Sequence, residues 1–273
     1  MSYRATILGC GSSGGVPRLN GDWGACDPAE PKNARLRCSL LVERSGAGGG
    51  FERDGVTSLL VDTSPDMRRQ MLNADVRRVD GVLYTHDHAD QSHGIDELRV
   101  FALTMGARIP VLMDELTGAT LIRRFDYCFK APEGSLYPPI LEARPMPTPG
   151  EAFEMTGPAG PIAATAFLQN HGPIDSLGFR FGGLAYSSDV VDLPEESFEL
   201  LEGVDTWIVD ALRYKPHRTH AHLDKALEWI DRVRPRRAVL TNLHIDMDYE
   251  TLKGRLPDGV EPAFDGMQLA FDA

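Results

Sequence analysis

The sequence predicts an α/β sandwich in which two β-sheets pack face to face and helices cover their outer sides. Two observations predict this fold. Short apolar runs typical of buried strands recur in both halves of the chain, and segments with helical spacing follow them in each half. No repeat or linker divides the 273 residues, so we expect one domain over residues 1–273 with a full hydrophobic core.

The first half supplies strands and helices in alternation. The predicted strands are Tyr3–Leu8, Cys38–Glu43, Thr57–Asp62, Gly81–Tyr84 and Ile109–Met113. The glycine-rich stretch 46–50 joins the second and third strands as a hairpin. Helices are predicted after Ser64-Pro65-Asp66, over Ile95–Leu103, and from Asp114 to Phe125. Residues 126–150, rich in proline and aromatic side chains, are expected to form an irregular rim or packed surface.

The second half repeats the pattern. The predicted strands are Glu151–Met155, Ile162–Leu168, Leu177–Phe181, Leu184–Ser187, Thr206–Val209, Ala238–Thr241, Val260–Phe264 and Met267–Phe271. Helices are predicted from Pro194, from His222 to near Pro235, and over Tyr249–Leu256.

Composition limits the partners. The 28 basic residues minus the 40 acidic ones give a net charge of −12, which disfavours a long nucleic acid but permits a small anion held by a metal. The four scattered cysteines indicate reduced thiols in a cytoplasmic protein. No signal peptide or membrane-spanning run is expected. The oligomeric state stays open, with a homodimer as one option.

Ligand-type side chains crowd the end of one predicted strand. After Gly81–Tyr84 the chain continues Thr85-His86-Asp87-His88-Ala89-Asp90. His86, His88 and Asp90 are two residues apart, so a strand-like backbone points them to one side. Imidazole and carboxylate suit Zn, Mn or Fe. We favour a divalent metal site over the alternative of a solvated turn.

The same residues resemble the T-H-x-H-x-D signature of the metallo-β-lactamase superfamily. The glycine-rich loop Gly9–Pro17 resembles that of its phosphoribosyl cyclic phosphodiesterase branch. The resemblance implies a four-layer αββα sandwich of two mixed β-sheets. It also implies two divalent ions, Zn or Mn, and hydrolysis of a small phosphodiester such as a cyclic phosphate of a ribosyl or nucleoside compound. A structural zinc of that branch is not expected, because only Cys26 and Cys38 stand near its position.

The resemblance also implies individual ligands. His86, His88 and His171 would bind the first ion, Asp189 would bridge, and Asp90 would belong to the second site. The chain departs from the family at two second-site positions, where Gln91 and Asn242 replace histidines, although His93 and His244 stand two residues further on. Three alternatives follow: the displaced histidines rebuild the site, the amides ligate, or one ion alone binds tightly. We expect a retained but altered second site, with His244 as the better ligand because it follows a strand.

Catalytic and substrate-binding roles follow from the same resemblance. His220 stands 22 residues before Asn242, as the general acid of the branch stands before its terminal metal histidine. His222 is the rival acid, and Asp90 or Asp189 would orient the attacking hydroxide. Substrate contacts are expected from side chains of the Gly/Ser loop and the metal region: Ser12, Ser13, His93, His220 and Asn242. The Gly/Ser loop is equally well explained as a tight irregular turn.

Two other functions remain in view. One is thioester hydrolysis of the glyoxalase II type, which would leave His220 without a clear task. The other is a non-catalytic binder of metal or nucleotide phosphate with a degraded second site, which Gln91 and Asn242 suggest. A small phosphorylated substrate or nucleotide is the expected partner in the favoured reading.

Overall fold

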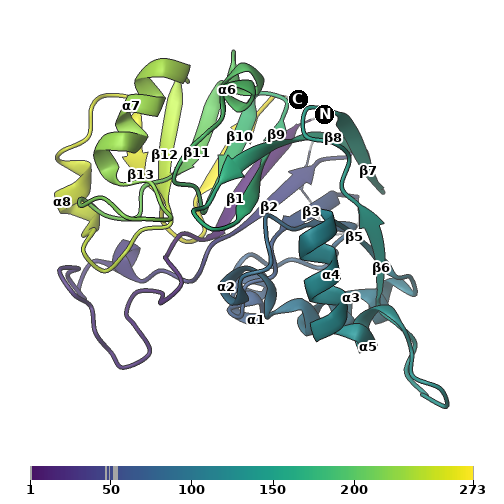
Figure 1. Cartoon of the computed structure of the whole chain (residues 1–273). Coiled ribbons are helices and arrows are strands. Elements are labelled where there is room, and N and C mark those ends of the chain that lie inside the picture. The colour runs from purple at the N-terminus through teal and green to yellow at the C-terminus, as the bar shows by residue number, and fades with distance from the viewer. Residues whose placement is uncertain (1, 47, 49, 52–54, 273) are drawn as a thin grey trace.

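Two seven-stranded sheets pack face to face in the computed structural model, which describes residues 2–46, 48, 50–51 and 55–272 (Figure 1). In order across the first sheet, the strands are β14 (Gln268–Phe271), β1 (Tyr3–Gly9), β2 (Ser39–Arg44), β3 (Thr57–Val61), β4 (Gly81–Leu83), β5 (Ile109–Met113) and β6 (Leu141–Pro145). Across the second they are β13 (Val260–Pro262), β12 (Arg237–Thr241), β11 (Thr206–Asp210), β10 (Leu184–Ser187), β9 (Asp175–Phe181), β8 (Gly160–Asn170) and β7 (Ala152–Gly157).

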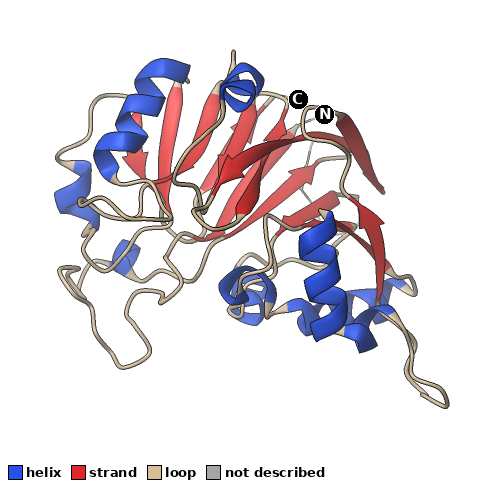
Figure 2. Cartoon of the chain, in the orientation of Figure 1, coloured by secondary structure: helices blue, strands red, loops and turns tan. Residues whose placement is uncertain are grey.

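Helices lie on the outer faces of both sheets (Figure 2). Those with the first sheet are α1 (Met67–Asn73), α2 (Ala89–Ser92), α3 (Leu98–Met105), α4 (Glu115–Arg124) and α5 (Asp126–Phe129). Those with the second are α6 (Glu195–Leu201), α7 (Leu223–Val233) and α8 (Tyr249–Lys253). Two 3₁₀ turns, η1 (Pro31–Asn33) and η2 (Ile95–Glu97), complete the described elements. The predicted four-layer αββα sandwich is therefore confirmed.

Alternation along the strands builds three apolar layers. In β3, Leu59 and Val61 enter the cluster between the sheets, whereas Leu60 faces the helices of the first sheet. On the other side, Trp207 of β11 joins the cluster beneath α6 and α7. Because both faces are buried, these strands are nearly continuous apolar runs, as expected for strands covered on two sides.

The strand directions bring the polar strand ends to one edge. Strands β3 to β6 run parallel, and so do β10 to β13. Strand β8 is antiparallel to β9, which is antiparallel to β10, so β8 and β10 end at the same edge. Polar residues follow these ends: Asp62 after β3, His86 after β4, His171 after β8, Asp189 after β10 and Asn242 after β12. The predicted mixed sheets thus place both halves of the chain around one site.

One region departs from the prediction. Residues 126–150, expected to be irregular, contain α5 and the edge strand β6, which pairs in parallel with β5. Only Leu141 of β6 is fully buried, and the strand ends in Pro145, so it carries no apolar run that would mark it. The predicted glycine-rich hairpin connection 46–50 lies partly outside the described residues.

Candidate metal centre

Backbone hydrogen bonds fix the loop that follows β4. Thr63 N–H donates to the Gln91 carbonyl and Gly94 N–H donates to the Thr63 carbonyl, both at 2.8 Å. A side chain at Gly94 is excluded, because a Cβ there would lie 2.1 Å from the Ser64 carbonyl oxygen. His88 has extended backbone (φ −61°, ψ 153°) immediately before α2. The short helix therefore places Asp90 and Gln91 directly beside the two histidines.

A buried relay orients His86. Asp62 accepts from Thr85 N–H and from Thr85 Oγ1, both at 2.8 Å, and Thr85 Oγ1 lies 2.9 Å from His86 Nδ1. Since the Thr85 hydroxyl donates its proton to Asp62, it accepts from His86 Nδ1, which leaves a lone pair on Nε2. Burial, together with the neighbouring His171 and His88, lowers the pKa of His86 well below its usual value. The neutral imidazole is the form that binds a metal.

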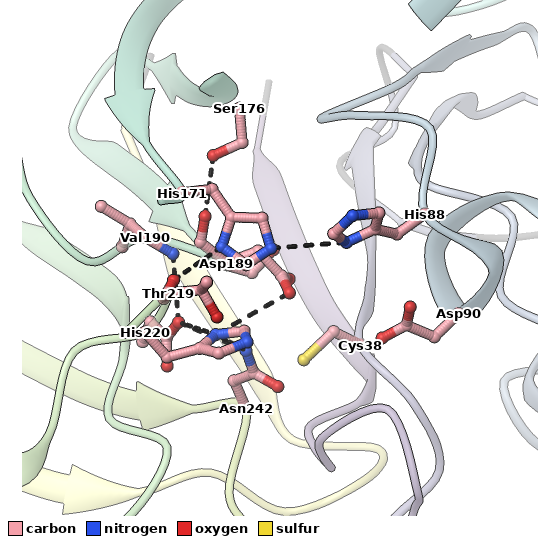
Figure 3. A network of polar contacts seen from close by, with 12 residues as sticks. Cys38, His88, Asp90, His171, Ser176, Asp189, Val190, Thr219, His220 and Asn242 are labelled. Atoms are coloured by element: carbon pink, nitrogen blue, oxygen red, sulfur yellow. Dashed lines mark hydrogen bonds and ion pairs between the residues drawn. The ribbon is translucent and has the colours of Figure 1, made fainter. Parts of the chain in front are cut away.

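Three imidazoles converge around one point. His171 Nδ1 lies 2.6 Å from the Thr219 carbonyl, an acceptor, so Nδ1 carries the proton and Nε2 a lone pair. His171 Nε2 lies 3.4 Å from His88 Nδ1 (Figure 3). His86 Nε2 is buried without a hydrogen-bond partner. Ligand atoms of all three residues lie within 4.8 Å of one another. An orphaned buried nitrogen and two converging lone pairs fit a divalent cation.

Asp189 and His220 lie next to this triad. One ligand atom each of His171, Asp189 and His220 lie within 4.8 Å of one another. Asp189 is buried and left-handed (φ 54°), a conformation that Asp tolerates better than most residues and that is concentrated at functional sites. His220 Nδ1 lies 2.9 Å from Asp210 Oδ2. Burial opposes the imidazolium, but the Asp210 carboxylate prevails and raises the pKa of His220 to about 9.

The residues at the expected second-metal position fit an ion poorly. Gln91 Nε2 donates to Asp189 Oδ2 at 3.0 Å and lies 3.5 Å from Asp90 Oδ2. Asn242 Nδ2 donates to Asp210 Oδ2 at 3.3 Å. A metal binds lone pairs, whereas both amides turn their NH₂ groups toward the carboxylates, and the lone pairs of Gln91 Oε1 are buried without a hydrogen-bond partner. Burial and the nearby Asp189 raise the pKa of Asp90.

The displaced histidines do not join the cluster. His244 Nε2 lies 2.6 Å from Arg18 Nη2, and since a guanidinium only donates, the lone pair of Nε2 is occupied. His93 is exposed and stacks edge-on against Phe125 at 5.6 Å. His222 is the residue before α7 and belongs to neither of the described ligand groups. The geometry thus gives no support to His93 or His244 as ligands, and the predicted role of His222 as the alternative general acid stays a prediction.

Two cavities flank the centre. The larger, about 490 Å³, contains His88, His93, Arg124 and Phe125 in its walls. The smaller, about 270 Å³, is lined by hydroxyls and basic groups around His220, namely Ser12, Ser13, Arg18, Arg213, His217 and His244. Ser12, Ser13 and His220 therefore share a cavity, as expected of substrate-binding residues, and Asn242 lies behind His220 with its Nδ2 3.1 Å from His220 Nδ1.

Sequence reasoning missed several of these residues. Asp210 directly follows the predicted strand Thr206–Val209 and received no predicted role, although its Oδ2 lies 2.9 Å from His220 Nδ1. Arg18, Arg213 and His217 carried no pattern, because they come together only through the fold. Asp210, a carboxylate at the end of the fully buried run Thr206–Asp210, was the one detectable signal.

Comparisons with known proteins agree with this geometry. A family model described as Beta-lactamase superfamily domain matches residues 57–245. A crystal structure described as a new diphosphatase from the PhnP family superposes with a TM-score of 0.85 at 32% identity, covering 99% of this chain and 98% of that one. Zn²⁺-bound PqqB from Methylobacterium extorquens superposes with a TM-score of 0.70 at 19% identity, covering 97% and 99%, and shares the fold. An octanoyltransferase of Porphyromonas gingivalis is 27% identical over 274 residues, which is 98% of this chain. The chain spans about half (52%) of that protein's length.

Proposed function

This chain belongs to the PhnP-like branch of the metallo-β-lactamase superfamily, and from that premise we propose that it is a metal-dependent hydrolase of small phosphodiesters. The substrate class proposed is a cyclic phosphate of a ribosyl or nucleoside compound. The observation that carries the proposal is the arrangement of His220, held by buried Asp210 and adjacent to the triad of His86, His88 and His171.

The superfamily fold implies divalent metal ions, and the triad is where the chain would hold one. A bound Zn or Mn ion lowers the pKa of water and polarises phosphoryl oxygens. The chain's own contribution is to bring three imidazoles together and to orient two of them, His86 through Thr85 and His171 through the Thr219 carbonyl. Fixing the tautomer in this way is the usual role of groups behind metal ligands.

His220 supplies the proton that a leaving alkoxide requires. With a pKa raised to about 9, its imidazolium persists at neutral pH, and Asp210 keeps the ring oriented through Nδ1. General acid catalysis of this type contributes about 10²–10⁴-fold to the rate. His222, the alternative general acid, belongs to neither of the two groups of potential metal ligands found among the described residues, whereas His220 belongs to one of them.

The surroundings of the site support an anionic substrate. The cavity beside His220 is lined by Arg18, Arg213 and His217, and none of its described lining residues carries a carboxylate. In a chain of net charge −12 the guanidinium groups of Arg18 and Arg213 favour a phosphate, which guanidinium groups bind with paired hydrogen bonds, while burial and the neighbouring His220 lower the pKa of His217. Its size suits a small phosphorylated compound or nucleotide rather than a long nucleic acid.

The test combines leaving groups with two histidine variants. Bis(p-nitrophenyl) phosphate, whose leaving group needs no proton, is compared with an alkyl diester, whose leaving group does. We expect His220→Ala to keep its metal and to lose about 10²–10⁴-fold on the alkyl diester but much less on the nitrophenyl ester. His222→Ala is the matched control and should retain both activities.

Two outcomes would count against the proposal. Equal losses on both esters would remove His220 from the acid role. A metal-loaded protein that binds phosphate tightly without turnover would support the non-catalytic binder instead.

The match to an octanoyltransferase favours thioester hydrolysis as the second candidate. A thiolate leaves without protonation, so His220→Ala should barely change hydrolysis of an acyl thioester. Thioester hydrolysis would be established if the protein hydrolyses acyl thioesters faster than phosphodiesters and if His220→Ala leaves the thioester activity unchanged.

A further inference from the structure

Two amide side chains stand where the family resemblance implied imidazole ligands of a second ion. Gln91 lies in α2 and Asn242 follows β12, and both are buried. The backbone of Asn242 is in the left-handed region (φ 60°), which Asn adopts more readily than most residues. Both side chains are therefore shielded from solvent, so water cannot replace the hydrogen bonds that they make.

The side-chain amide of Gln91 lies against the carboxylates of Asp189 and Asp90. Its Nε2 donates to Asp189 Oδ2 at 3.0 Å and lies 3.5 Å from Asp90 Oδ2. The amide nitrogen therefore lies beside the oxygens that would face a second cation, whereas Gln91 Oε1 is buried without a hydrogen-bond partner. A second cation there would require the bond to Asp189 to break and the amide to turn its oxygen toward the ion.

The side chains of Asn242 and His220 are hydrogen-bonded to Asp210. Asp210 Oδ2 lies 2.9 Å from His220 Nδ1, 3.1 Å from Val190 N–H and 3.3 Å from Asn242 Nδ2. Asp210 is completely buried; these protein donors satisfy its Oδ2, whereas its Oδ1 is buried without a hydrogen-bond partner. The Asn242 amide nitrogen and His220 Nδ1 thus serve a carboxylate rather than a metal.

No displaced side chain restores the missing ligands within the described residues. His93 is exposed, and the Nε2 of His244 is occupied by Arg18. The group of His171, Asp189 and His220 shares His171 with the triad, so it does not define an independent site. Two carboxylates alone fall short of the four ligands that zinc usually takes.

We propose that this chain holds one divalent ion, at His86, His88 and His171, and that hydrogen bonds from Gln91 and Asn242 replace the second ion of the family. The inference goes beyond the proposed function, since it concerns metal content and not the reaction. It departs from the two ions expected from the resemblance and selects the third of the alternatives that the sequence left open.

The test is metal stoichiometry. The protein is produced with zinc and manganese in the medium, desalted without chelators, and measured by inductively coupled plasma mass spectrometry. We expect about one ion per chain in the parent and about two in the double variant Gln91→His, Asn242→His, because two imidazoles complete the second ligand set. Gln268→His adds a histidine at an exposed position of β14 and should stay at one ion.

Each result decides the inference independently of activity. Two ions in the parent would overturn it, and so would a double variant that folds but still holds one. If the double variant does not fold, the parent's stoichiometry and a single step in a zinc titration monitored by calorimetry decide alone. Failure to hydrolyse phosphodiesters would end the proposed function while leaving the stoichiometry intact.

Discussion

Two hydrogen bonds decide which nitrogen of His86 faces the cluster. Asp62 accepts a hydrogen bond from the Thr85 hydroxyl, and the Thr85 hydroxyl in turn accepts a hydrogen bond from His86 Nδ1. Asp62 is fully buried in left-handed conformation (φ 63°), and burial raises its pKa well above the usual value despite the donors from Thr85. The chain thus maintains a strained, buried carboxyl whose contact with Thr85 sets one histidine tautomer.

We predict that Thr85→Val weakens metal binding about 10- to 100-fold, because His86 loses the acceptor that fixes its tautomer. The substitution conserves shape, so the triad itself should stay in place. The measurement is a competition titration against a chelating dye. Thr104→Val, on the exposed side of α3, is the matched control and should bind as the parent does. An unchanged affinity in Thr85→Val would show that the relay does not orient the ligand.

Residues close in sequence were predictable at this scale, and residues joined by the fold were not. The spacing of His86, His88 and Asp90 after a strand pointed to one cluster; the structure groups His86 and His88 with His171, whereas Asp90 Oδ2 lies 3.5 Å from Gln91 Nε2. Gln91 meets Asp189, 98 positions away, and His244 meets Arg18, 226 positions away. No local sequence pattern predicts such distant partners. The contact between His244 and Arg18 therefore became visible only in the fold.

Strand ends are the elements that build the site. The apolar runs of β3, β4, β11 and β12 were recognisable because these strands are buried on both faces, and polar groups stand at their ends along one edge. The edge strand β6 was missed, because most of its residues are exposed and no alternation or apolar run marks it. The buried strands were thus predictable, and so was the exposed edge strand β7, which overlaps the predicted strand Glu151–Met155, whereas β6 was not.

Helix α8 is tied to the irregular segment before β2 through its N-cap. Asp248 accepts from Thr251 N–H at 2.9 Å, from Asn33 Nδ2 at 2.7 Å and from Asp27 N–H at 3.2 Å. Burial is the largest single influence and acts to raise the pKa of Asp248, but the hydrogen-bond donors led by Thr251 N–H together outweigh it and hold the pKa at about 2. The ionised form is therefore favoured in the folded state.

We predict that Asp248→Ala lowers the free energy of unfolding by about 1 kcal/mol at pH 7, while Asp248→Asn, itself a good N-cap, costs less. Because the folded pKa lies below the unfolded value of about 3.9, the contribution is complete above that pH and is lost as the pH falls toward about 2. Urea unfolding at pH 7 and near pH 3.5 measures it. A gap between parent and Asp248→Ala that widens on acidification would contradict this account.

At the scale of the molecule, the site joins the two sheets. His86 and His88 follow a strand of the first sheet, whereas His171, Asp189 and His220 belong to the second half. The two-sheet sandwich was predictable from the recurrence of strand runs, but the meeting of the two edges was implied only by the family resemblance. The single domain over 1–273 stays a prediction. Among the described residues, no helix has both the length and the apolar character needed to span a bilayer.

A metal held by both halves should link binding to global stability. An ion that binds only the folded chain stabilises it by about 2.7 kcal/mol when its free concentration is 100 times the Kd. For a chain of this size each kcal/mol raises Tm by roughly 2–4 °C, so we predict a rise of about 5–10 °C between chelator-treated and metal-loaded protein. Differential scanning calorimetry measures the difference. His88→Ala should abolish it, because the triad then lacks one ligand, and His222→Ala should preserve it. A shift that survives in His88→Ala would mean that the stabilising ion binds elsewhere than between the sheets.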